Sequence, residues 1–164
     1  MRSLVIVKDY RPISCCSVLY KIISKMLAKI LHDVVSTFIC DGQLGFILGR
    51  KIQDNIILPH ELVKAYTRKN ISLRSMLKIN LQKAYDFVEW PYLEQMLLAL
   101  GFPNLFTKWV VLCVKTVSYA IIVNKTASQH FAANKGLRQG DPISPLLFTI
   151  AMKYLIDYSR GSIL

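Results

Sequence analysis

The chain has 164 residues, enough for one domain with a buried core, and 53% of them are apolar, with a mean hydropathy of +0.36. No apolar run approaches the roughly 18 residues that cross a bilayer, so the sequence predicts no membrane span. Lys and Arg outnumber Asp and Glu by 21 to 10, and the net charge of +11 suits a polyanion such as nucleic acid, although a basic, solvated surface would give the same count.

The first half of the chain predicts two helices separated by a glycine-rich stretch. After an extended start, Pro12 favours a turn at "YRPIS", and Ser14 is placed to cap a helix that runs to about residue 39. Its apolar residues recur at spacings of three and four and define one expected core face: Leu19, Ile22, Ile23, Met26, Leu27, Ile30 and Leu31. Residues 41–52 are expected to form a loop or short hairpin, and residues 53–69 a helix interrupted near Pro59.

The second half predicts more helices than strands. Residues 73–81, "LRSMLKINL", have the character of a buried strand, and "SYAIIVN" at 118–124 predicts a second one. A helix starts at Pro91 and ends at Gly101, another covers 103–116, and a last one begins near Pro142. The expected fold class is therefore α/β in the loose sense (α+β), rich in helices, with a small antiparallel sheet.

The loop "KGLRQGDPISPLLF", residues 135–148, is the most specific stretch of the chain. Gly136 and Gly140 allow a backbone to approach a ligand closely, and Asp141 with Pro142 marks a helix start. Three residues separate the glycines and no Lys-Ser or Lys-Thr follows, so the loop is not a phosphate-binding P-loop. Taken alone, it also fits a capped helix with a polar loop.

The four cysteines form no recognisable framework. Cys15, Cys16, Cys40 and Cys113 include no CxxC pair and have no metal-ligand spacing with the histidines, so no zinc site is predicted. With no signal peptide in the sequence, we expect reduced, structural thiols in an intracellular compartment, the cytoplasm or the nucleus.

Four ordered stretches together resemble one family. "YRPISCCSVLYKIISKMLAKIL", "GFILGRKIQDNIILPHELV", "LKINLQKAYDFVEW" and "KGLRQGDPISPLLF" are similar, in order and spacing, to the reverse transcriptase domain of plant LINE-type non-LTR retrotransposons. The resemblance runs from about Asp9 to Leu155. It implies part of the fingers and palm of a right-hand polymerase, with residues 1–70 fingers-like and residues 71–164 an incomplete palm. It also implies RNA-directed DNA polymerisation on RNA or DNA partners, with nucleoside triphosphates and Mg²⁺.

The resemblance also implies roles for individual residues. It implies that Arg11 contacts the incoming nucleotide, and that Gly49 and Arg50 lie near the template. An arginine suits a triphosphate, because its guanidinium binds phosphate oxygens in pairs.

The resemblance assigns three later residues to the same nucleotide site. Tyr85 matches the bulky side chain that lies under the sugar and excludes a 2′-hydroxyl, while Gln139 and Gly140 match the loop that positions the template base and the nucleotide.

The same comparison shows a departure at Asn80. The family has an aspartate there that holds two magnesium ions together with a later pair of aspartates. Asparagine has nearly the same shape but is neutral and offers one amide oxygen, and Asp86 lies six residues on, past the expected strand end. No two acidic residues are adjacent in the 164 residues, and the usual lysine-bearing strand before "YRPIS" is missing. We therefore expect an inactive, truncated domain with no intact catalytic or metal site. The alternatives are a non-catalytic, basic nucleic-acid-binding protein that binds weakly and without sequence preference, and a retroelement relic with no selected function.

Overall fold

The protein is described from a computed structural model, which places residues 13–39, 43, 45, 51, 53–65 and 79–159. The helices are α1 (Val18–Phe38), α2 (Asp54–Ala65), the short 3-10 helix η2 (Ala84–Phe87), α3 (Trp90–Ala99), α4 (Asn104–Lys115) and α5 (Ser144–Ser159). The strands are β1 (Ser118–Tyr119), β2 (Ile122–Val123), β3 (Thr126–Ala127) and β4 (Phe131–Ala132). The expected fold class is confirmed: the described chain is rich in helices and has small antiparallel sheets.

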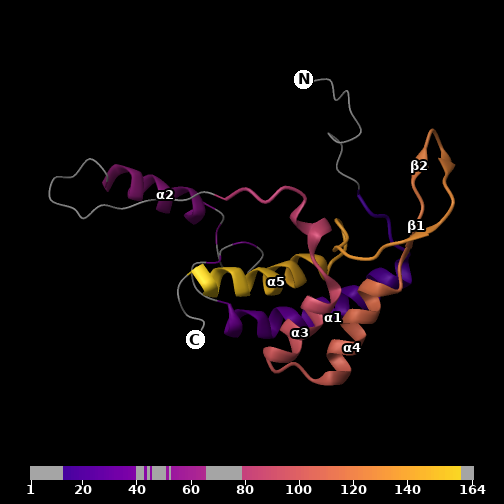
Figure 1. The fold of residues 1–164 in the computed structure, drawn as a ribbon, viewed down its shortest axis with the longest axis horizontal. Coiled ribbons are helices and arrows are strands. Elements are labelled where there is room, and N and C mark those ends of the chain that lie inside the picture. The colour runs from indigo at the N-terminus through magenta and orange to yellow at the C-terminus, as the bar shows by residue number, and fades with distance from the viewer. Residues whose placement is uncertain are drawn as a thin grey trace.

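Helices α1, α3, α4 and α5 pack together into the core, with α5 along α1 and α3 against α4 (Figure 1). The largest side chains that are almost fully buried come from these helices and from the segment before α5: Leu31, Val35, Leu93, Leu97, Val110, Ile143, Leu147 and Ile150. Helix α2 lies apart from this bundle in Figure 1, and each of its side chains whose burial is described is exposed. The loops between the helices are therefore attached to this packed bundle.

Helix α1 forms where expected but differs in its cap and its buried face. Ser17, not Ser14, is the N-cap, and its hydroxyl accepts a hydrogen bond from the Tyr20 amide at 3.3 Å. The prediction of one apolar core face is wrong for most of its members, since five of the seven side chains are at least 44% exposed: Leu19, Ile22, Ile23, Met26 and Ile30. The buried face consists of Ser24, Leu27, Ala28, Leu31 and Val35. Small residues at two of these positions let another helix approach closely, so the core lies on that side.

The predicted boundaries of α3 are confirmed. Pro91 occupies the first turn, where a missing N–H costs nothing, and Gly101 follows the helix with φ +81°. The Phe102 amide donates to the Leu97 carbonyl at 3.1 Å, which satisfies one of the last carbonyls of the helix. Helices α4 and α5 are also confirmed, although α5 begins at Ser144 rather than at Pro142.

The strand expected over residues 118–124 forms as two short pieces of an exposed ribbon. β1 pairs with β4 and β2 with β3, both antiparallel, and the ribbon extends from the bundle (Figure 1). Asn124 and Lys125 connect β2 to β3 with φ of 50° and 67°, the geometry of a tight two-residue hairpin. The prediction of a strand is thus confirmed for Ser118–Tyr119 and Ile122–Val123, and the segment is largely exposed, with Ile122 72% exposed.

Several expectations fall on residues outside the described ranges. These are the extended start, most of the glycine-rich stretch at 41–52, most of the strand at 73–81 and the boundary between the two expected subdomains at residue 70. In the described part of the chain, no helix combines the length and apolarity that a membrane crossing requires.

Candidate functional site

The loop of residues 135–143 passes between two segments that are far away in the sequence. The Leu137 amide donates to the Tyr85 carbonyl at 2.8 Å, and the Gly136 amide donates to the Val88 carbonyl at 2.8 Å. On its other side the loop accepts a hydrogen bond, from the Ser14 amide to the Gln139 carbonyl, at 3.0 Å. Three of the stretches that carry the family resemblance therefore meet at one place.

Gly136 is required at its position by two separate constraints. Its φ is +94°, which side chains disfavour, and a Cβ atom added to it would lie 3.1 Å from the backbone oxygen of Asp86. The Trp90 indole donates to the Gly136 carbonyl at 2.8 Å, so the peptide is held on both sides. Gly136 therefore allows a close approach to the chain's own segment 86–88, and the expected approach of this loop to a ligand remains a prediction.

Gln139 and Gly140 lie at the tip of the same loop. Gly140 has φ +95° and is exposed, and a Cβ atom there would lie 3.4 Å from the Ser14 carbonyl oxygen. Gln139 is half-buried beside it. Gln139 and Gly140 are thus the accessible part of the loop, whereas Arg138 and Asp141 on either side of them are buried. Their role toward a template or nucleotide remains a prediction.

Tyr85 lies on η2 and stacks on Phe148 of α5, with ring centroids 4.7 Å apart and an interplanar angle of 18°. Burial raises the pKa of the Tyr85 hydroxyl, so the ring stays neutral at physiological pH. The stacking fixes the orientation of the ring, as a residue that limits the space beside a sugar would need. That the ring lies beneath a sugar remains a prediction.

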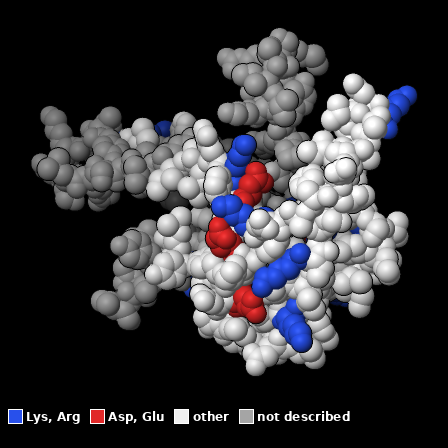
Figure 2. All heavy atoms as spheres, turned by 45° about the vertical axis from the view of Figure 1, so that its right-hand side comes forward, with Lys and Arg blue, Asp and Glu red and all other residues white. Residues whose placement is uncertain are grey.

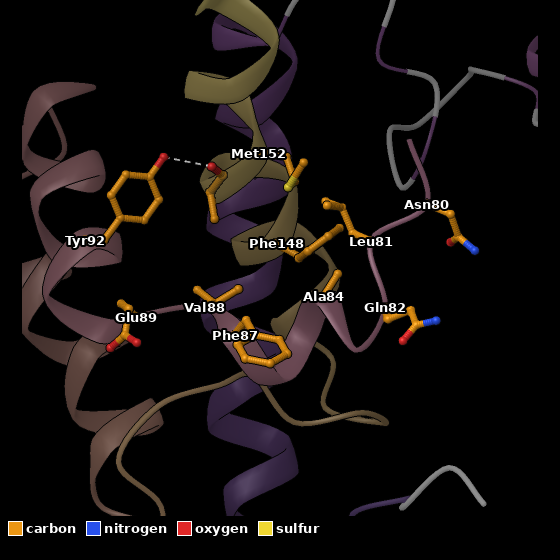
Figure 3. Close-up of a pocket in the computed structure, with 11 residues that line it drawn as sticks. Asn80, Leu81, Gln82, Ala84, Phe87, Val88, Glu89, Tyr92, Phe148 and Met152 are labelled. Carbon is orange, nitrogen blue, oxygen red and sulfur yellow. Dashed lines mark hydrogen bonds between the residues drawn. The ribbon is translucent and has the colours of Figure 1, made fainter. Parts of the chain in front are cut away.

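Asn80 is exposed and lies in a segment without regular secondary structure, which leads through a turn at 82–83 into η2. Figure 3 shows the Asn80 and Gln82 side chains pointing away from α5, while Leu81 points toward Phe148 and Met152. Residues 79–81, the described end of the strand expected over 73–81, are not assigned to a strand. Beside the segment is an open hollow of about 540 Å³ with an apolar lining that includes Leu81, Phe148 and Met152.

The described residues do not fit a pair of magnesium ions. Among the side chains placed in the structure, no group of three or more His, Cys, Asp or Glu residues could hold a metal. Asn80 offers only a neutral amide oxygen, and Mg²⁺ favours carboxylates. Glu89 also lines the hollow, but its carboxylate pairs with the Lys135 ammonium at 3.2 Å.

A buried polar network behind the loop was not predicted from the sequence. The Tyr20 hydroxyl donates to Asp141 Oδ2 at 2.6 Å, and the Ser24 hydroxyl donates to Asp141 Oδ1. Arg138 Nη2 lies 3.4 Å from Asp141 Oδ2 and donates to the Cys113 carbonyl at 2.7 Å. Burial, and then the hydrogen bond to Asp141, raise the pKa of the Tyr20 hydroxyl.

One signal for this network was present in the sequence. Arg138 and Asp141 are opposite charges three residues apart in a loop that contains two glycines, next to a strongly apolar segment. Their separation in sequence indicates a local ion pair, but Tyr20 and Ser24 could not be identified as partners because they lie more than 100 residues away.

The remaining predicted site residues, Arg11, Gly49 and Arg50, lie outside the described residues. Ser14, three residues after Arg11, is described and bonds directly to the loop at Gln139. The structure therefore brings together Tyr85, Gln139 and Gly140 with the segment that follows Arg11.

Comparison with known proteins gives one consistent result. Residues 3–163 match the family described as "Reverse transcriptase (RNA-dependent DNA polymerase)". The chain is 30% identical over 148 residues to the transposon TX1 149 kDa protein of Xenopus laevis, with 90% of this chain and 11% of that protein covered. It is 28% identical over 149 residues to the Pol polyprotein of the type-2 retrotransposable element R2DM of Drosophila melanogaster, with 91% and 14% covered. A type-1 element R2 polyprotein of Nasonia vitripennis is 27% identical over 145 residues, with 87% and 14% covered.

The chain thus spans about a seventh or less of the length of these relatives, and the match covers nearly all of the chain. The family match also agrees with the meeting of the three stretches around the loop at 135–143. The chain belongs to the reverse transcriptase family, as a domain of the non-LTR retrotransposon type.

Proposed function

We propose that this domain places a nucleic-acid template and an incoming nucleotide against the loop tip formed by Gln139 and Gly140. One observation carries the proposal: backbone hydrogen bonds from Ser14 and to Tyr85 and Val88 hold two distant segments, one on each side of this loop. A loop held in this way keeps its exposed tip in one conformation, which a positioning surface requires.

The proposed roles follow the positions of the residues. Gln139 and Gly140 contact the template base and the nucleotide, and Tyr85 limits the space at the sugar. Arg11 reaches the triphosphate, and Gly49 with Arg50 lies along the template. These roles divide the chain into a fingers-like part, residues 1–70, and a palm-like part, residues 71–164.

We propose further that the domain as given does not polymerise by itself. Two magnesium ions a few ångströms apart repel each other and need anionic ligands, and Asn80 provides none where the family resemblance places a carboxylate. The chain would then bind primer and template without joining nucleotides. In the family, the Mg²⁺ ions would be held by carboxylates, and the described residues of this chain do not form such a cluster.

Primer extension and binding test the two parts of the proposal separately. We expect no Mg²⁺-dependent extension of a DNA primer on an RNA template, either by the wild type or by Asn80→Asp, since one restored carboxylate cannot balance two dications. Extension by the wild type above a no-protein control, abolished by a chelator, would refute the inactivity. Extension by Asn80→Asp alone would show that Asn80 is the only lesion.

Binding is measured with a fluorescent primer–template in about 50 mM and about 200 mM salt, because neutralised phosphates make affinity fall steeply with salt. We expect Gln139→Ala to weaken binding by about twofold to tenfold, as for loss of one hydrogen bond. Gln95→Ala is the matched control, since Gln95 is an exposed residue of α3 away from the loop. Equal affinities for the two variants would refute the role of the loop tip.

A second candidate function is binding of nucleic acid by charge alone, and the net charge of +11 favours it. On the face shown in Figure 2, however, the basic side chains of the described residues do not gather into one patch, and several lie beside acidic ones. Binding that depends on salt but not on Gln139 would identify this alternative. We further propose the plant LINE-type branch of the family, on the four motifs, and a reducing intracellular compartment, on the free thiols of Cys15, Cys16 and Cys113.

A further inference from the structure

The loop tip lies between two buried charges. Arg138 is 8% exposed and Asp141 is 4% exposed, whereas Gln139 is half-buried and Gly140 is exposed. Removing two charges from water is costly, and their mutual attraction offsets that cost only when further hydrogen bonds satisfy both groups. Each charge of this pair has such partners, and they lie on different helices.

Asp141 joins the loop to α1. It accepts hydrogen bonds from Tyr20 and Ser24, which are one turn apart on that helix, and its Oδ1 also accepts from the Ile143 amide at 3.3 Å, just before α5. Arg138 joins the loop to α4 through the Cys113 carbonyl, and its guanidinium lies 3.9 Å from the centre of the Tyr20 ring. Two residues that flank the tip are therefore fixed to two different helices.

We propose that Tyr20, Arg138 and Asp141 are positioning residues: they hold Gln139 and Gly140 in the conformation that receives nucleic acid, without touching it themselves. This inference rests on the proposed function of the loop tip. It adds that affinity depends on side chains buried behind the loop, and that the hydroxyl of Tyr20 on α1 is one of its determinants.

The choice of charged residues supports positioning rather than stability alone. A well-packed apolar group generally stabilises a core as much as a buried ion pair does. Hydrogen bonds to a carboxylate are directional, so Asp141 with its donors specifies one orientation of the loop backbone, which an apolar contact does not. The tip is short, and a small rotation at either flanking residue would displace it.

Tyr20→Phe tests this with little change in shape. The substitution removes the hydrogen bond to Asp141 but keeps the ring beneath Arg138. Tyr92→Phe is the matched control, because it removes the same kind of group, a half-buried hydroxyl that donates to the Ala151 carbonyl at 2.9 Å, between α3 and α5. Binding of a fluorescent DNA primer on an RNA template is measured at a temperature where both variants are fully folded. Hydrogen exchange of the amides at 137–140 is measured in the same buffer.

We expect Tyr20→Phe to weaken binding by about tenfold, as for loss of a hydrogen bond to a charged group, and to speed exchange at 137–140. Tyr92→Phe is expected to change neither quantity. Asp141→Asn, which keeps the shape but removes the charge, is expected to weaken binding at least as much where it folds. Wild-type affinity in Tyr20→Phe, beside weakened binding in Gln139→Ala, would overturn the positioning role and leave the proposed function standing. Failure of the wild type to bind would overturn the proposed function and this inference with it.

Discussion

Replacing Gly136 with alanine tests how closely the loop packs against the segment that contains Tyr85. The added Cβ atom would lie 3.1 Å from the Asp86 backbone oxygen and 3.2 Å from its Cα atom, closer than side chains normally approach. Neither side can shift freely, because the Gly136 amide bonds to Val88 and its carbonyl accepts from Trp90, each at 2.8 Å. The substitution therefore forces two pieces of backbone apart.

The expected loss in the free energy of unfolding has three contributions. An alanine in a left-handed backbone conformation destabilises the folded state by about 1–2 kcal/mol, and overpacking destabilises it by about 1–3 kcal/mol more. In the other direction, alanine restricts the unfolded chain more than glycine does, which stabilises the protein by about 0.4–1 kcal/mol. We expect Gly136→Ala to lower the free energy of unfolding by about 2–4 kcal/mol on these terms. Gly101→Ala carries the same backbone strain at φ +81°, but no atom lies within 4 Å of its Cβ position. Gly101→Ala is therefore expected to lower the free energy of unfolding by about 0–1.6 kcal/mol, the same sum without the overpacking.

Urea unfolding followed by tryptophan fluorescence measures both values, and the buried Trp90 reports on this contact directly because its indole bonds to Gly136. The two losses of stability can be compared directly if the free energy of unfolding falls with urea concentration at the same slope in both variants. Equal losses of stability in Gly136→Ala and Gly101→Ala would refute the close approach of the loop to Asp86.

Three further predictions concern titration, thiol chemistry and association. Burial raises the pKa of the Tyr20 hydroxyl, so its neutral form contributes stability that is complete below the ordinary tyrosine pKa of about 10 and is lost as the pH rises above it. Between about pH 9 and about pH 11, the melting temperature should therefore fall less steeply in Tyr20→Phe than in the wild type. Parallel decreases in the two proteins would contradict this. Burial also raises the pKa of the half-buried Cys113, so iodoacetamide should modify the exposed Cys15 first, as mass spectrometry of timed samples would show; the reverse order would count against the burial of Cys113. The exposed apolar side of α1, with Met26 63% exposed, should cause self-association that Met26→Lys reduces in light scattering, and a monomeric wild type would exclude it.

The helices could be predicted from the sequence because local chemistry determines their ends. Pro91 and Gly101 are each suited to one end of α3, and both lie where the pattern placed them. The buried side of α1 could not be predicted in the same way. Its apolar residues cover more than half of the helix, and periodicity cannot tell which of two apolar sides faces the core. Ser24 and Ala28, which are less hydrophobic than their neighbours, are buried because their small size suits a close helix contact.

The site was predictable to the extent that it depends on glycine and on chain order. Gly136 has no alternative at its φ and spacing, and that requirement is visible in the sequence. The buried network was not predictable, because Asp141 and its hydroxyl donors are 117 and 121 residues apart. No periodic pattern extends over such a distance, and only the packing of α1 near the start of α5 brings the three side chains together.

The loop at 135–143 and the side chain at position 80 depend on different interactions. The contacts that gather Ser14, Tyr85 and Val88 around the loop are backbone hydrogen bonds, which do not depend on the side chain at position 80. Asn80 is exposed, and its side chain points away from α5, so Asn80→Asp would add negative charge without removing a packing contact. A substitution at position 80 is therefore compatible with an unchanged loop at 135–143. Binding assays on the loop variants and extension assays on Asn80→Asp will therefore report on two independent properties of the domain.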